Sequence, residues 1–155
     1  MKLVPLKQWI CDSCGGIIEK PDDGWLEWYE DRNTYLQAGF RIVHHGHASP
    51  RNPHSKCQYD GKQLYSQNKM LLDNKLVDFL GLDGLGVLIS MIETRKFADI
   101  KEIVYIVRRL HFPYYEEARQ YWDDAKRDGF FDGANEYWPF LKRTLQAIIK
   151  RYEEN

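Results

Sequence analysis

Trp9-Ile-Cys-Asp-Ser-Cys-Gly-Gly16 begins the stretch that decides the fold of this 155-residue chain, and His54-Ser-Lys-Cys57 ends it. All three cysteines and four of the five histidines of the chain lie between residues 9 and 59. Thiolates and imidazoles are the usual ligands of structural zinc, and glycines directly after a C-x-x-C pair permit the tight turn that such a site needs. The sequence therefore predicts a small β module, residues 1–62, held together by one zinc ion.

The two pairs, Cys11-x-x-Cys14 and His54-x-x-Cys57, resemble the knuckles of zinc-ribbon and treble-clef modules. In that resemblance the two pairs close one tetrahedral site, with Cys11, Cys14 and Cys57 as thiolate ligands. Gln58 and Tyr59 stand where the second knuckle usually has glycine, which leaves the fourth ligand open between His54 and His45. Alternation along the strand would bury His44 with Phe40 and Ile42, so His44 ranks behind both.

Strand patterns flank this loop-rich stretch. Aromatic and β-branched residues predict strands over residues 25–30 and 40–45, and Pro50 and Pro53 keep the segment between Gly46 and Lys56 irregular. A redox role for C-x-x-C is disfavoured, because that chemistry needs a helix after the first cysteine and Gly15-Gly16 is a poor helix start.

The remainder, residues 63–155, has helical periodicity and predicts an α+β protein with a mainly helical second domain. Helices are expected over residues 68–80, from Asp83, from Asp99 with Glu102 as a capping box, from Pro113 and from Pro139. The segment 130–138, with Asp132-Gly133 at its centre, predicts a short hairpin.

Two helices around His111-Phe112-Pro113 followed by a hairpin resemble a winged-helix unit, and a plain helical bundle with one hairpin explains the same pattern. The winged-helix resemblance implies DNA contact through the helix over residues 113–128. Glu116, Glu117, Asp123 and Asp124 would repel phosphates there, so a protein partner is expected and nucleic acid is disfavoured.

No catalytic motif settles an activity: the chain has no P-loop, no nucleophile elbow and no His-Glu-x-x-His pair. His44-His45 with Asn52 and His54 resembles the HNH metal-dependent nucleases, which implies a histidine base oriented by the asparagine. The spacing departs from that family, since Pro50 and Pro53 exclude the helix that should carry the last histidine. We expect a non-enzymatic adaptor, with a nucleic-acid-binding regulator and an HNH-like nuclease as alternatives.

The composition of the chain limits the classes of protein to which it can belong. Hydrophobic residues make up 43% of the chain and the formal net charge is −1, which favours a core-forming protein without a field that attracts nucleic acid or membrane. The chain carries no signal-peptide run and no apolar stretch of membrane-spanning length. An odd number of cysteines in a C-x-x-C context suits a reducing compartment, so a cytoplasmic location is expected.

Overall fold

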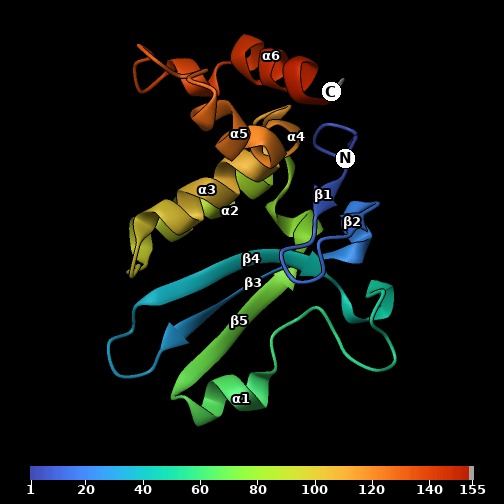
Figure 1. Ribbon diagram of the computed structural model, residues 1–155. Helices are drawn as coiled ribbons and strands as arrows, with labels where there is room; N and C mark the ends of the chain where they lie inside the picture. The colour runs from blue at the N-terminus through green and yellow to red at the C-terminus, as the bar shows by residue number, and fades with distance from the viewer. Residues whose placement is uncertain (154–155) are drawn as a thin grey trace.

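The computed structural model describes residues 1–153 and shows an α+β fold (Figure 1). The strands are β1 (Trp9–Ile10), β2 (Ile17–Ile18), β3 (Gly24–Asp31), β4 (Gln37–His44) and β5 (Lys69–Lys75). The α-helices are α1 (Gly61–Ser66), α2 (Gly81–Thr94), α3 (Ile100–His111), α4 (Tyr115–Ala118), α5 (Trp122–Arg127) and α6 (Lys142–Glu153). Short 3₁₀ turns are η1 (Pro21–Asp23), η2 (Gly46–Ala48), η3 (Leu76–Phe79), η4 (Arg119–Tyr121) and η5 (Trp138–Phe140).

A three-stranded antiparallel sheet, in the order β4-β3-β5, occupies the middle of the molecule (Figure 1). The predicted strands 25–30 and 40–45 are confirmed as β3 and β4, paired so that Gly24 lies opposite His44. The predicted helix over residues 68–80 is wrong. That segment forms β5 and η3 instead, because Lys69–Lys75 pairs along the free edge of β3.

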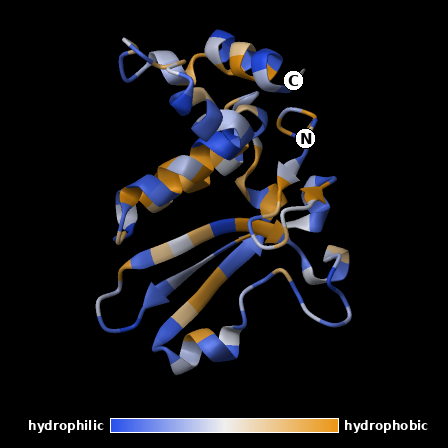
Figure 2. Cartoon of the chain, in the orientation of Figure 1, coloured by the Kyte–Doolittle hydropathy of each residue, from blue (hydrophilic) through white to orange (hydrophobic). Residues whose placement is uncertain are grey.

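One hydrophobic core lies between this sheet and the helices α2 and α3, which cover one of its faces (Figures 1 and 2). Its fully buried side chains come from β1 through α3 and include Trp9, Leu26, Ile42, Leu76 and Ile106. These residues lie on both sides of the predicted boundary at residue 62, and the core is continuous across it. The division of the chain into a zinc-binding module, residues 1–62, and a helical domain, residues 63–155, stays a prediction.

The predicted start of α3 is confirmed. Asp99 is its N-cap and accepts a hydrogen bond from the Lys101 N–H at 2.9 Å. Glu102 does not complete a capping box. Its Oε2 accepts from the backbone N–H groups of Gly39 and Phe40 at 2.7 and 3.0 Å, which ties α3 to β4.

The segment after α3 differs most from expectation. The helix predicted from Pro113 is divided into α4, η4 and α5. Among the described residues 130–138 there is no strand, so the predicted hairpin is wrong. Asp132-Gly133 lies in a turn, but the rings of Phe130, Phe131 and Trp138 pack on one another in edge-to-face and tilted arrangements, and no strand pairing forms. The last helix begins at Lys142 rather than Pro139.

A buried ionic network joins the N-terminal turn to the helices. Arg109, 1% exposed, donates from Nε and Nη2 to the Glu116 carboxylate at 2.7 and 2.9 Å and from Nη1 to Asp12 Oδ2 at 2.6 Å. Arg119 donates to the same Glu116 carboxylate at 2.7 and 2.8 Å. Glu116 Oε1 also accepts from the Ile10 N–H at 2.9 Å, so β1 is fixed against α4.

Within residues 1–153, none of the helices combines the length and the apolar character that a bilayer crossing requires.

Candidate metal centre

Four side chains from three separate segments converge at one end of the sheet. Cys11 and Cys14 come from the turn between β1 and β2, His44 ends β4, and Cys57 follows the loop that begins with η2. Their ligand atoms all lie within 4.8 Å of one another. Within residues 1–153 this is the one group of histidine, cysteine or carboxylate side chains close enough to hold a metal ion. The predicted thiolates therefore do lie together.

The turn that carries Cys11 and Cys14 has the geometry of a metal knuckle. The Gly15 N–H donates to the Cys11 carbonyl at 2.9 Å, and the Cys11 N–H donates to the Gly16 carbonyl at the same distance. Gly15 has φ +74°, which a residue with a Cβ rarely adopts. A Cβ at Gly16 would lie 3.4 Å from the Cys14 sulfur. Gly15 thus allows the tight turn beneath the two thiols, and at Gly16 a side chain would make only an ordinary contact with the Cys14 sulfur.

His44 points its Nδ1 atom at this turn. Nδ1 lies 3.4 Å from the Cys14 sulfur and 3.8 Å from the Cys57 sulfur. A tetrahedral ion with bonds of ~2.0–2.3 Å places its ligand atoms roughly 3.4–3.8 Å apart. The distances from the imidazole nitrogen to these two sulfurs therefore match those of one tetrahedral ion.

The hydrogen bond on the far side of the His44 ring fixes its tautomer. Nε2 lies 3.0 Å from the Ile17 carbonyl oxygen, which can only accept, so the proton of the neutral ring resides on Nε2. The lone pair of Nδ1 therefore faces the thiols. Metal-binding histidines commonly make such a bond from the nitrogen that does not bind the metal.

The thiols have their own supporting contacts. Ser49 Oγ lies 3.2 Å from the Cys57 sulfur, and the Gly16 N–H donates to the Cys14 sulfur at 3.4 Å. Burial raises the pKa of Cys14 to about 11, against the lowering effect of that Gly16 N–H, and the neighbouring Cys11 and Cys57 thiols raise it further. Without a cation the Cys14 thiol stays protonated at neutral pH, so a metal ion must displace its proton to bind.

Neither histidine that the sequence favoured as fourth ligand belongs to the cluster. His45, the first residue after β4, contacts other rings instead, with its ring centroid 4.8 Å from that of Trp25 and 4.4 Å from that of His47. His54 lies exposed in the loop after η2. The structure places His44 in the cluster instead, because the buried end of β4 lies beside the turn that carries Cys11 and Cys14.

Burial was the reason for ranking His44 last, and His44 is indeed only 5% exposed. Cys11 and Cys57 are each 1% exposed and Cys14 is half-buried, so a buried imidazole fits the cluster. His44 therefore is buried on the face of β4 that alternation predicts, but its neighbours there are thiols as well as apolar side chains. A strand-end histidine that follows inward-facing Ile42 was the signal available in the sequence.

Comparison with family models, with curated proteins and with solved structures gives no match for this chain. The chemistry of the four ligands therefore carries the functional conclusion.

Proposed function

We propose that this chain is a non-enzymatic interaction protein whose fold is held by one structural zinc ion at Cys11, Cys14, His44 and Cys57. The complete and largely buried ligand set carries the proposal. Three thiolates and one imidazole fill the four positions of tetrahedral zinc, whereas catalytic zinc sites keep one position for water or substrate. Soft thiolate ligands in a tetrahedral arrangement favour zinc over magnesium, calcium or manganese. Thiolates of this kind persist in a reducing compartment such as the cytoplasm.

The position of the site supports a structural role. The ligands come from three segments of the chain that are far apart in sequence. One of them, the loop from Gly46 to Lys56, forms no strand pairing after η2. Arg51 donates to Ser13 Oγ and to the Ser13 carbonyl at 3.1 and 2.9 Å, so this loop already lies against the knuckle. A bound ion would anchor the loop at Cys57 and the knuckle at Cys11 and Cys14.

The nuclease alternative finds little support in the arrangement of its residues. A general base needs a free ring nitrogen that can reach water. His44 directs Nδ1 at the thiols and Nε2 at the Ile17 carbonyl. Of the other residues in the HNH resemblance, His45 packs against the rings of Trp25 and His47, and Asn52 and His54 lie exposed in the loop after η2.

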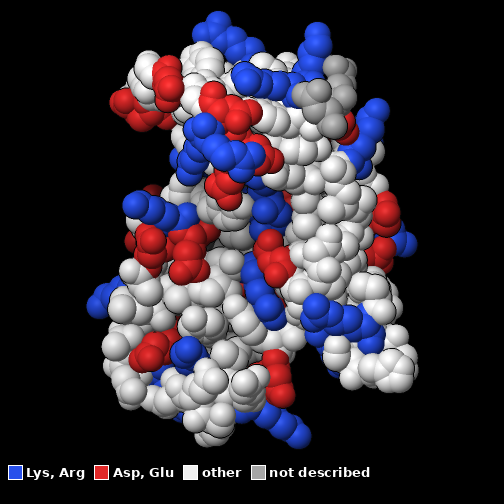
Figure 3. Space-filling model, in the orientation of Figure 1, with Lys and Arg blue, Asp and Glu red and all other residues white. Residues whose placement is uncertain are grey.

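One observation favours nucleic acid as a second candidate. The exposed face of α6 carries Lys142, Arg143, Lys150 and Arg151, and Figure 3 shows Lys and Arg gathered over this end of the molecule. Glu116 and Glu117, expected to repel phosphates, are buried. Residues 130–138, expected to form the wing, contain no strand, however. Four cationic side chains on one helix can also neutralise only a few phosphates, which limits the affinity for nucleic acid. A protein partner therefore remains the first proposal.

Cobalt substitution separates a closed structural site from an open catalytic one. With Co²⁺ in place of zinc, we expect one ion per chain with the visible absorption of a tetrahedral site and thiolate-to-metal charge-transfer bands. Because all four positions are filled by protein, azide or imidazole added in excess should leave the spectrum unchanged. His44→Gly provides the control: it opens one position, and added imidazole should then bind the ion and alter the bands.

A spectrum of the wild-type protein that changes saturably with azide would show an open coordination position. That result would contradict the proposal of a closed structural site.

A further inference from the structure

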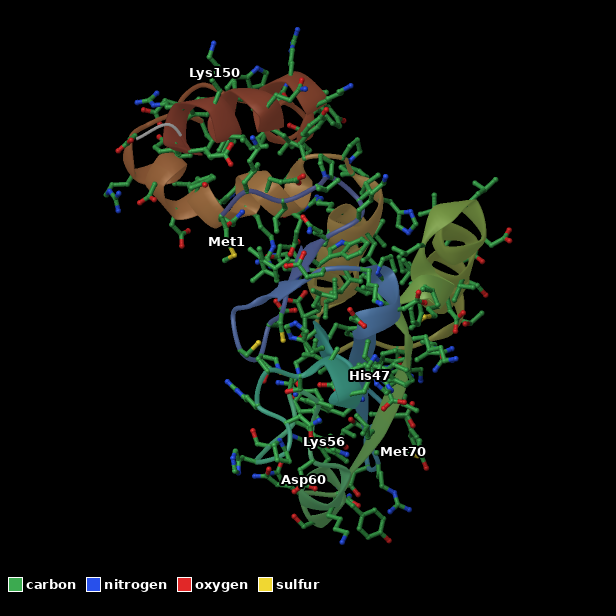
Figure 4. The ribbon with its side chains drawn as sticks, turned by 90° about the vertical axis from the view of Figure 1, so that its right-hand side faces the viewer. Met1, His47, Lys56, Asp60, Met70 and Lys150 are labelled. Carbon is green, nitrogen blue, oxygen red and sulfur yellow. The ribbon has the colours of Figure 1, made fainter. Side chains whose placement is uncertain are left out.

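A cavity of about 220 Å³ lies on the helical side of the molecule, away from the thiols. One wall is the N-terminal segment, and the others come from α4, η4 and α6. The Gln120 side chain donates to the Met1 carbonyl at 2.9 Å, which holds the N-terminal wall against η4. Figure 4 shows Met1 beside this helical region and below α6, which carries Lys150. No ligand of the metal centre lines the cavity.

The feature that distinguishes this cavity is Glu117, which lines it. The residue is 6% exposed, and among residues 1–153 neither of its buried carboxylate oxygens has a hydrogen-bond partner. A buried carboxylate without a partner is costly, and in folded proteins such groups are rare unless a ligand or ion satisfies them. Burial, with added repulsion from Glu116 and Glu153, raises the pKa of Glu117 to about 6.

The preceding residue, Glu116, lies in the same short helix and has a carboxylate whose hydrogen bonds are satisfied. It accepts hydrogen bonds from two guanidinium groups and from the Ile10 N–H. Against the effect of burial, Arg109 and Arg119 lower its pKa to about 2. Glu117 has the same side chain and comparable burial, but among residues 1–153 no cation donates a hydrogen bond to it. Two cations line the same cavity: the N-terminal ammonium of Met1, which donates to the Tyr121 hydroxyl at 3.3 Å, and Lys2. A cation that pairs with the Glu117 carboxylate must therefore come from a bound ligand or from a side chain in the wall of the cavity.

The other walls suit a cation on an apolar stem. Glu153 adds a second carboxylate, and Tyr114 and Tyr121 add aromatic rings, whose faces attract ammonium and guanidinium groups. Tyr114 has φ +72°, a left-handed conformation that a tyrosine adopts only under constraint and that is commoner at functional sites. Leu3 and Ile149 supply apolar surface. The volume lies below the ~300–1,000 Å³ typical of drug-sized ligands, and therefore fits one side chain or one small amine.

We propose that this cavity binds a primary ammonium or guanidinium group carried on a short aliphatic stem, with the Glu117 carboxylate as its counter-ion. The stem would lie against Leu3 and Ile149, and Glu153 would stand as the second carboxylate at the wall. Such a group occurs both on a lysine or arginine side chain of a partner protein and on a free alkylamine. The proposed chemistry is common to the two sources, and the experiment distinguishes them.

The test is a calorimetric titration of the full-length, zinc-loaded protein with two probes, n-butylammonium chloride and the blocked peptide acetyl-Gly-Lys-Gly-amide. We expect saturable binding of at least one probe in the millimolar range, with affinity that falls at least tenfold in Glu117→Gln. Glu93→Gln, which removes an exposed carboxylate from α2, is the matched control and should bind as the wild type does. A peptide that binds at least tenfold more tightly than butylammonium identifies a protein side chain as the natural ligand; the reverse identifies a free amine.

A second readout does not depend on any variant that might fail to fold. Carboxyl NMR of the wild-type protein should show the pKa of Glu117 falling when the probe binds, because a cation favours the ionised carboxylate. The affinity should accordingly weaken as pH drops below about 6.

Two results would overturn the proposal. One is the absence of saturable binding of either probe, with the Glu117 pKa unmoved. The other is saturable binding whose affinity is the same in Glu117→Gln as in the wild type, since that would show that Glu117 is not the counter-ion of the bound cation. Failure of the cobalt experiment would leave the amine site standing, because none of the residues proposed to bind the amine is a metal ligand.

Discussion

Replacing Cys11 with serine is expected to abolish stoichiometric zinc binding and, with it, the fixed packing around the sheet. Structural zinc sites contribute on the order of 10–16 kcal/mol of apparent binding free energy, whereas a whole domain is stable by only about 5–15 kcal/mol. Cys11 is 1% exposed and belongs to the same core as Trp9, Leu26 and Ile42. Loss of the ion should therefore unfold the knuckle and loosen the core, not merely free a loop.

Metal analysis together with near-UV circular dichroism measures this. The variant should contain less than a tenth of the wild-type zinc, and the aromatic signal of buried Trp9 and Trp28 should be lost. Ser13→Ala, two residues along the same turn, removes only the hydroxyl that accepts from Arg51 and should keep both zinc and signal. A Cys11→Ser protein with an unchanged near-UV spectrum would show that the fold does not need the metal.

Replacing Arg109 with methionine is expected to lower the free energy of unfolding by about 3–5 kcal/mol, the usual cost of removing one partner from a buried ion pair. The variant leaves the Glu116 and Asp12 carboxylates without their shared guanidinium. It also removes the donor to the Ile10 carbonyl at 2.9 Å, so β1 loses an attachment to α3.

Urea denaturation of the zinc-loaded protein measures the effect. The control is Arg127→Met, which removes an exposed partner of Asp124 and should cost less than about 1 kcal/mol. The network also predicts acid sensitivity. The pKa of Glu116 is lowered from its ordinary 4.5 to about 2, so its stabilising contribution is full above pH 4.5 and is lost as the pH falls towards 2. If Arg109→Met lowers the free energy of unfolding by no more than Arg127→Met does, the buried network contributes little to stability.

The local features of this chain were predictable from sequence. Cys11-x-x-Cys14-Gly-Gly predicts a knuckle because the chemistry and the turn lie within six consecutive residues. Asp99 predicts the start of α3 because a cap needs only the next turn of helix. The strands β3 and β4 follow from their aromatic and β-branched residues. In each case the signal and the structure that it produces are close in the chain.

Features that depend on distant partners were not predictable in the same way. Lys69–Lys75 shows no clear alternation and becomes β5 because β3 offers an unpaired edge. Arg109 lies in an apolar helical stripe between Ile106 and Leu110, and only the approach of Asp12 and Glu116 explains a buried arginine there. The hairpin over residues 130–138 failed because its aromatic residues have better partners in each other than in a second strand.

The fourth ligand illustrates the same limit at the metal site. Sequence spacing favoured His54, which mirrors Cys11-x-x-Cys14 at the other end of the stretch. The pairing of Gly24 with His44 decides otherwise, since it sets which end and which face of β4 meet the knuckle. Register is a property of two strands together, and the sequence of β4 alone does not contain it.

The zinc dissociation constants of three histidine variants test the central claim most directly. The account predicts that His44→Ala weakens zinc binding by more than about 100-fold, beyond the 10–100-fold typical of outer contacts, and that His45→Ala and His54→Ala stay within a factor of three of the wild type. Retention of full affinity in His44→Ala, with its loss in His45→Ala or His54→Ala, would contradict the assignment of His44 as the fourth ligand.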